Sequence, residues 1–204
     1  SIRMGQKGLS SEILQDYGAQ IKFYSKGDIV FKEDTIPRYF HQIDTGCVKM
    51  ISHGEDGRTF TQGIFTDGQC FGEPPLVINA LYPATAQVIT DSQIIRLTKD
   101  SFEKMLLENS SMCHQLNLLL ATRAYEKTKT NMMLTGQAPE IRIGFILDKF
   151  KTNMECLDNQ KNQICLTRQE IADFTGLRVE TVIRTLKRME TENKIEIRNR
   201  KLYY

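Results

Sequence analysis

The hydrophobic pattern of this chain changes its period near residue 100, and that change limits the folds that the chain can adopt. Before residue 100, short runs of β-branched and aromatic residues are separated by glycine-containing turns about every ten residues. Short strands at this spacing are typical of an antiparallel sandwich or barrel. After residue 100, apolar residues recur three and four positions apart, as in amphipathic helices. We therefore expect an α+β chain whose N-terminal half is an antiparallel β domain.

The strand signals of the first half are runs of β-branched and aromatic residues bounded by turn residues. We expect strands at residues 29–31, 47–51, 59–65 and 94–97. Glycines are expected to turn the chain at residues 26–28, 45–47, 55–58 and 67–69. The pair Asp56 and Gly57 predicts a hairpin, because this dipeptide tolerates the positive φ of a tight turn.

A long helical pattern follows and ends near Leu134, before Gly136 and Pro139, which resist helix continuation. Its apolar positions are Leu106, Met112, Leu116, Leu119, Leu120 and Tyr125. A pattern of about 25 residues favours a seam between two copies of the chain, whereas the plainer interpretation is a core helix of one domain. A further amphipathic helix is expected at residues 141–150.

The C-terminal unit shows, in order, the features of a helix-turn-helix. Thr167 and Glu170 predict a capping box, in which each side chain bonds the other residue's backbone N–H. Gly176 breaks this first helix, and a second helix is expected from about Val179 to Glu190. The inner face of the second helix carries Val182, Leu186 and Met189. In a helix-turn-helix, the second helix enters the major groove of DNA.

Glu180 and Arg184 are four residues apart, so both lie on one face of the second helix. Arginine can donate two bonds to guanine O6 and N7, and glutamate can accept from cytosine N4. The alternative is a solvated helix with an intrahelical ion pair. From residue 166 onward, nine Lys and Arg stand against six Asp and Glu, an excess larger than the +2 of the whole chain. This local charge favours DNA as the partner.

The last twelve residues alternate apolar and polar side chains about a turn at Arg198 and Asn199. This pattern predicts a two-stranded wing after the helix-turn-helix. Arg198, Arg200 and Lys201 would then face DNA phosphates, or else protect the edge of a sheet with charge.

The motifs together resemble those of the cyclic-AMP receptor protein/FNR (CRP/FNR) family of bacterial transcription regulators, over nearly the whole chain. The matching stretches are residues 26–31, 43–49, 56–58, 67–73, 85–90, 95–97, 167–172 and 180–184. The resemblance implies a jelly-roll sensor domain at residues 1–108, a dimerisation helix at 109–137 and a winged helix-turn-helix domain at 138–204. It also implies a homodimer that binds double-stranded DNA, with RNA polymerase as a further partner.

The resemblance places an effector pocket in the sensor domain. Its expected members are Phe71, Gly72, Glu73, Ala84, Thr85 and Thr128. In cyclic-nucleotide-binding members, an arginine before the Ser/Thr-Ala pair holds the cyclic phosphate, but Ala84 stands at that place here. Glu73 matches the residue that bonds the ribose hydroxyl. We therefore expect an effector other than cAMP; the alternatives are a constitutive regulator with a vestigial pocket and a cyclic-nucleotide-responsive one.

The second helix resembles that of the FNR subgroup, whose targets carry TTGA-like half-sites. Val179 stands where the cyclic-AMP subgroup has a base-reading arginine, and Ile183 replaces a polar residue. The residues expected to contact DNA are Thr167, Arg168, Gln169, Arg178, Val179, Glu180, Thr181, Arg184, Lys187 and Arg198. Arg178 would occupy the N-cap of this helix, where it is a poor capping residue.

Several classes of protein are not expected. The five cysteines (47, 70, 113, 156 and 165) contain no C-x-x-C pair and leave the first 46 residues without cysteine, so no disulfide framework, zinc module or FNR-type iron–sulfur cluster is expected. His41, His53 and His114 are interpreted as surface residues; the alternative is a haem-ligand role for one of them. Without a nucleophile–base pair, an enzyme is not expected. No membrane helix or signal peptide is expected, so the protein should be cytoplasmic.

Overall fold

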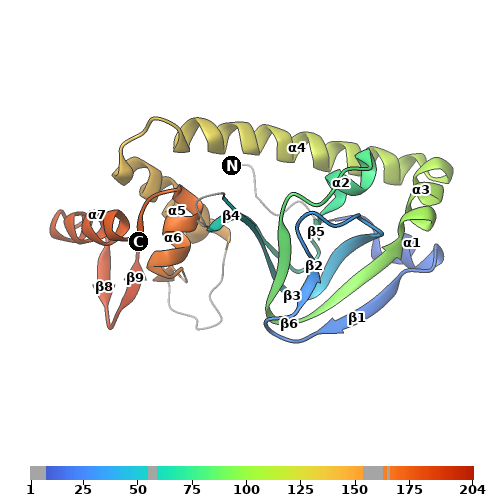
Figure 1. The fold of residues 1–204 in the computed structure, drawn as a ribbon, viewed down its shortest axis with the longest axis horizontal. Coiled ribbons are helices and arrows are strands. Elements are labelled where there is room, and N and C mark those ends of the chain that lie inside the picture. Colours follow the sequence, from blue (N-terminus) through green and yellow to red (C-terminus); the bar gives the residue numbers. More distant parts are fainter. Residues whose placement is uncertain (1–7, 55–58, 154–162, 165) are drawn as a thin grey trace. The chain divides into compact units, whose positions relative to one another are not determined.

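The structure is a computed structural model that describes residues 8–54, 59–153, 163–164 and 166–204. It divides into two compact units, with the boundary in the chain between Tyr125 and Glu126. The N-terminal unit is built on an antiparallel sheet and the C-terminal unit on short helices (Figure 1). The change of period near residue 100 therefore marks a real change of architecture, and the expected α+β class is confirmed.

The N-terminal unit contains one antiparallel sheet in the order β1-β6-β3-β4, with β2 paired to β6 and β5 paired to β3. The elements are α1 (Ser11–Asp16), β1 (Gln20–Tyr24), β2 (Ile29–Phe31), β3 (Tyr39–His53), β4 (Thr59–Thr66), β5 (Cys70–Phe71), α2 (Glu73–Ile78), β6 (Thr85–Thr98), α3 (Lys99–Glu108) and α4 (Ser110–Leu134). The four strands predicted for the first half of the chain all lie in this sheet. The hairpin turn at Asp56 and Gly57 lies outside the described residues, but the flanking His53 and Thr59 are paired.

The predicted turn at residues 45–47 is wrong, because β3 continues through it. Gly46 has a φ of +115°, and the register between β3 and β6 shifts on either side of it. A Cβ at this position would collide with Ser92 of β6. The glycine therefore bends a long strand against its neighbour and does not end it. Residues 85–98 likewise form one long strand, β6. The sequence had indicated only two separate stretches of it, residues 85–90 and 94–97.

Two apolar clusters fill the N-terminal unit. One joins the helices to the sheet and includes Leu14, Phe40, Leu97, Phe102, Met105, Met112, Leu116 and Leu119. The other lies among the strands and includes Tyr24, Phe31, Ile43, Val48, Phe71, Tyr82, Ala84 and Ile94. The first turns of α4 are thus packed against their own domain through three of the apolar residues that the sequence pattern identified.

The C-terminal unit consists of α5 (Pro139–Asn153), β7 (Gln163–Ile164), α6 (Arg168–Thr175), α7 (Val179–Thr191), β8 (Glu196–Arg198) and β9 (Lys201–Tyr203). The β8–β9 hairpin, drawn in red in Figure 1, is the predicted wing. Asn199 and Arg200 turn it with φ values of 49° and 64°, which match the right-handed twist of the two strands. The two-residue strand β7 adds a third member on β9 and was too short to predict.

Candidate nucleic-acid interface and effector site

Helix α6 begins with the predicted capping box. The Thr167 hydroxyl accepts from the Glu170 N–H at 3.1 Å, and the Glu170 carboxylate accepts from the Thr167 N–H at 2.8 Å. The helix ends at Gly176, whose φ of 65° lies in the left-handed region. Local sequence therefore sets both ends of this helix.

Buried apolar side chains and two hydrogen bonds stabilise the turn between α6 and α7. Ile171 and Ala172 of α6 are buried, as are Val182, Leu186 and Met189 of α7. Arg142 of α5 donates to the carbonyl oxygen of Thr175, and the Thr175 hydroxyl donates to that of Ile171 at 2.6 Å. The two helices are thereby held at a fixed angle on α5, so that the opposite face of α7 is left to solvent.

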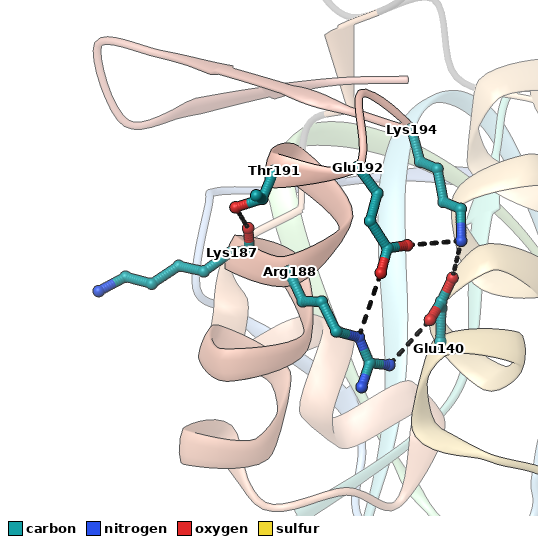
Figure 2. A network of polar contacts seen from close by, with 6 residues as sticks. All are labelled: Glu140, Lys187, Arg188, Thr191, Glu192 and Lys194. Atoms are coloured by element: carbon teal, nitrogen blue, oxygen red, sulfur yellow. Dashed lines mark hydrogen bonds and ion pairs between the residues drawn. The ribbon is translucent and has the colours of Figure 1, made fainter.

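The exposed face of α7 carries Glu180, Ile183, Arg184 and Lys187. No ion pair joins Glu180 to Arg184 in the part of the chain that the structure describes, and both side chains are exposed. Arg178 is the N-cap residue and makes no side-chain capping bond, as expected. Lys187 extends away from the neighbouring polar network into open space (Figure 2). The face therefore presents one carboxylate and two cations to a partner.

Other predicted DNA contacts already have partners within the unit. Gln169 donates to Asp173 at 2.8 Å, and the Thr167 hydroxyl is engaged in the cap. Arg198 of the wing pairs with Glu196 and lies over the Tyr203 ring, 5.6 Å from its centroid. Arg168, Val179 and Thr181 are partly buried.

A polar network that the sequence analysis missed ties α5 to the end of α7 (Figure 2). Glu140, in the first turn of α5, accepts from Arg188 at 2.8 Å and from Lys194 at 2.5 Å. Glu192 pairs with Lys194 at 2.6 Å and with Arg188 at 3.9 Å. The hydrogen bond from Lys194 and, to a smaller extent, the one from Arg188 hold the pKa of Glu140 below its usual 4.5. Arg188 thus serves the fold, in contrast to its neighbour Lys187.

Replacing Glu140 by glutamine is expected to lower the unfolding temperature of the C-terminal unit by a few degrees at pH 7. Because the folded state lowers the pKa of Glu140, its stabilisation is complete above pH 4.5 and is lost as pH falls through the folded-state pKa. Thermal unfolding of wild type and variant, followed from pH 7 to pH 3, measures this. The difference between the two proteins should shrink as the pH falls below 4.5, and a difference that does not change with pH would contradict the assignment.

Three of the expected effector residues, Phe71, Gly72 and Glu73, lie at the junction of β5 and α2. Glu73 is completely buried at the start of α2, and its Oε1 pairs with Arg123 of α4. Arg123 also donates to the Cys70 carbonyl oxygen at 2.5 Å and lies 5.3 Å from the centroid of Phe65. Glu73 Oε2 is buried with no hydrogen-bond partner among the described residues. Arg123 was not predicted, since fifty residues separate it from its partner.

The remaining effector residues differ in their surroundings. Phe71 and Ala84 are completely buried in the same apolar cluster. Gly72 has a φ of 73°, and a Cβ there would lie 2.7 Å from the Phe31 ring. The Thr85 hydroxyl accepts from the Glu33 N–H at 3.0 Å. Thr128 is exposed on α4, in the part of the helix that belongs to the C-terminal unit.

The interpretation of His41 as a surface residue is wrong. Its side chain lies on β3, inside the N-terminal unit, and only 4% of the residue is exposed. Burial, aided by the charges of Arg96 and Lys22, lowers its pKa to about 3, so the imidazole is neutral at pH 7. His53 is exposed and lies 3.6 Å from Glu33, and His114 is exposed on α4.

The described ranges contain neither a cluster of metal ligands nor a membrane-spanning helix. No group of three His, Cys, Asp or Glu side chains there is placed to hold a metal ion. No helix within those ranges is both long enough and apolar enough to cross a bilayer. Burial raises the pKa of the Cys47 thiol to about 11 and that of the Cys70 thiol further, so both are protonated at neutral pH.

Two family models match this chain. The cyclic nucleotide-binding domain matches residues 21–109, and the Crp-like helix-turn-helix domain matches residues 145–203. The chain is 25% identical over 177 residues to the nitrogen fixation regulation protein FixK of Bradyrhizobium diazoefficiens, which covers 85% of this chain and 73% of that protein. It is 26% identical over 182 residues to the transcriptional activatory protein AadR of Rhodopseudomonas palustris, covering 88% and 74%.

Solved structures share the fold. The c-di-GMP responsive global regulator CLP of Xanthomonas campestris has a TM-score of 0.82 at 18% identity, with 95% of this chain and 98% of that chain covered. FixK2 from Bradyrhizobium japonicum has a TM-score of 0.75 at 21% identity, with 91% of each chain covered. At these identities the likeness extends to the order and packing of the elements.

Proposed function

Since this chain belongs to the CRP/FNR family of transcription regulators, with a cyclic nucleotide-binding domain and a Crp-like helix-turn-helix domain, we propose that it reads a palindromic DNA site as a homodimer. The family consists of DNA-binding regulators and not of enzymes. The observation that carries the proposal is the exposed face of α7, where Glu180 and Arg184 stand one turn apart without an ion pair between them.

Glu180, Ile183, Arg184 and Lys187 of α7, with the N-cap residue Arg178, each suit one kind of DNA contact. Arg184 donates to guanine O6 and N7, while Glu180 accepts from cytosine N4. Ile183 is 42% exposed between them and suits the methyl group of thymine, in keeping with a TTGA-like half-site. Lys187 and Arg178 bind backbone phosphates, which fix the register of the helix without reading sequence.

The residues around α7 contribute to orientation. Val179 and Thr181 flank Glu180 and contact the same half-site from the first turn of the helix. Thr167, Arg168 and Gln169 lie at the start of α6, which crosses the DNA backbone in this type of module. Arg198 must break its ion pair with Glu196 before it can contact a DNA phosphate. It therefore contributes less to the binding free energy than an unpaired arginine would.

The exposed side of α4 supports a homodimer. Residues His114, Leu118, Ala121, Tyr125, Thr128 and Met132 are exposed and follow one another at intervals of four and three. That spacing is the heptad pattern of a two-stranded coiled coil. Met112, Leu116 and Leu119 are packed inside the N-terminal unit, so they are not available for a contact between two chains. We therefore assign the dimer contact to the exposed stripe.

An effector other than cAMP is proposed to control the dimer. The position that holds the cyclic phosphate in nucleotide-binding relatives is the completely buried Ala84, which offers an anion no donor. Glu73 Oε2 can accept from a hydroxyl group of an effector, and Arg123 links Glu73 to α4. A ligand acts here only if it binds one arrangement of the helix better than another. Calorimetry with cAMP should accordingly detect no specific binding.

The spacing of half-sites tests the proposed function. Two recognition helices of a dimer lie about one DNA turn, roughly 34 Å, apart. A duplex with two inverted TTGA-like half-sites at that spacing should bind tightly, and an insert of about five base pairs should abolish cooperative binding because it turns one half-site to the opposite side of the duplex. Fluorescence anisotropy against scrambled competitor measures both. Equal binding to the two duplexes would contradict a dimeric reader.

Leu118→Asp tests the proposed dimer contact on α4. A carboxylate buried in the seam should raise the dimer dissociation constant by roughly a hundredfold or more. Lys127→Glu is the matched control, because it places a carboxylate on the exposed surface of α4 outside the stripe. Sedimentation equilibrium should show monomer for Leu118→Asp and dimer for the control. A dimer in both cases would exclude this seam.

A further inference from the structure

The N-terminal unit contains a cavity of about 300 Å³, and none of the expected effector residues lines it. It lies against β1, β2, β3 and β6, and its walls combine aromatic rings with cations. The lining residues that matter most are Phe31, Arg38, Tyr39, His41, Tyr82 and Arg96. A volume of this size is at the lower end of the range for small-molecule sites.

The lining is positively charged. Lys22, Arg38 and Arg96 belong to it, and no aspartate or glutamate does. None of the three cations forms an ion pair with an acidic side chain in the described part of the chain. Arg96 stacks on Tyr39 with 3.9 Å between its guanidinium carbon and the ring centroid, so its plane is fixed inside the wall. Such an excess of fixed positive charge favours an anionic ligand.

Three buried polar groups of the lining lack a hydrogen-bond partner among the described residues. They are His41 Nδ1, the Tyr82 hydroxyl and Arg96 Nε. His41 and Tyr82 are 4% and 2% exposed, and His41 is paired directly with Arg96 across β3 and β6. The Tyr82 hydroxyl and Arg96 Nε are donors, and a neutral imidazole also donates in its Nδ1–H form. A ligand with several acceptor oxygens would satisfy all three, and leaving them unpaired costs free energy.

The remaining walls are flat and apolar. Phe31 and Tyr82 stack nearly parallel, with 3.6 Å between their centroids, and Phe31 lies 5.5 Å from His41. Tyr24 and Tyr39 close other sides of the cavity. Aromatic walls of this kind accept a planar ring by offset or edge contacts.

From this combination we propose that the cavity binds a small aryl carboxylate, with the carboxylate toward Arg96, His41 and Tyr82 and the ring among the tyrosines. The inference concerns ligand binding by the N-terminal unit and does not depend on the proposed DNA function. Its test uses the full chain without DNA, so the failure of one proposal leaves the other standing.

Isothermal titration calorimetry with benzoate tests the proposal, with benzamide and inorganic phosphate as comparison probes. Benzoate should saturate one site per chain. Benzamide, which keeps the ring but lacks the charge, and phosphate, which keeps the charge but lacks the ring, should each bind about tenfold more weakly or worse. Absence of saturable benzoate binding, or equal binding of either comparison probe, would overturn the proposal.

Two substitutions locate the site. Arg96→Gln should weaken benzoate binding about tenfold or more, and Tyr82→Phe, which removes only a hydroxyl group, should weaken it about threefold to tenfold. Lys26→Gln removes a cation from a turn outside the lining and should leave the affinity within about twofold. If Arg96→Gln fails to fold, Tyr82→Phe decides the question alone. Unchanged benzoate affinity in a folded Tyr82→Phe protein would contradict the placement of the carboxylate.

Discussion

Arg184→Ala is expected to weaken binding to a cognate duplex by about 1–3 kcal/mol and to relax the choice of base at one position of each half-site. The physical reason is that Arg184 is exposed on α7 with no acidic partner among the described residues, so that DNA gains a bidentate contact without breaking an ion pair. Competition binding against the four base-pair variants at each position measures the effect. Equal losses on cognate and random duplexes would contradict a base-reading role.

Lys187→Ala is the matched control on the same face of α7. Lys187 extends into open space in Figure 2 and is expected to contact phosphate. Its removal should weaken all duplexes alike and reduce the slope of log affinity against log salt by about one. The comparison separates charge from base recognition, because both variants lose one positive charge.

Arg123→Met is expected to destabilise the N-terminal unit by about 3–5 kcal/mol, since it leaves the carboxylate of Glu73 buried without its cation. The double variant Arg123→Met/Glu73→Gln should recover much of the loss, because a neutral amide costs less to bury than an unpaired charge. Urea unfolding at pH 7 measures both.

Lys127→Met controls for the loss of a cation from α4, and it should change the free energy of unfolding by less than about 0.5 kcal/mol. A loss below about 1 kcal/mol for Arg123→Met, or no recovery in the double variant, would show that the buried pair is unimportant for stability. The pair is significant beyond stability, because it is a contact between the β5–α2 junction and α4. A ligand that displaces Glu73 would therefore act, through Arg123, on the helix that we assign to the dimer seam.

The sequence predicted the elements whose signals are local. The capping box at Thr167 and Glu170, the break at Gly176 and the wing turn at Asn199 all arise from residues within a few positions of one another. The end of α4 followed from Gly136 and Pro139, but the apolar pattern before them did not show the break at Asn109 between α3 and α4. Family motifs added the order of the domains, which local patterns alone left open.

Features that depend on distant residues were missed. Glu73 meets Arg123, and Glu140 meets Arg188, across about fifty positions of sequence, and many other pairings of these charges were equally compatible with the composition. The burial of His41 was missed because the strand that carries it was expected only at residues 47–51, whereas β3 begins at Tyr39. The face that α4 presents to solvent was also hidden, since its apolar residues occupy two stripes and only packing shows which one is covered.

The most direct test of the central claim, that Glu180 and Arg184 read base pairs in the major groove, is selection of bound duplexes from random DNA. The wild-type chain should enrich an inverted repeat with half-sites about one helical turn apart, each with a fixed G·C pair that Arg184→Ala no longer requires. Enrichment of the same fixed pair by Arg184→Ala, or no enrichment by the wild type in the presence of benzoate and of cell metabolites, would contradict the account.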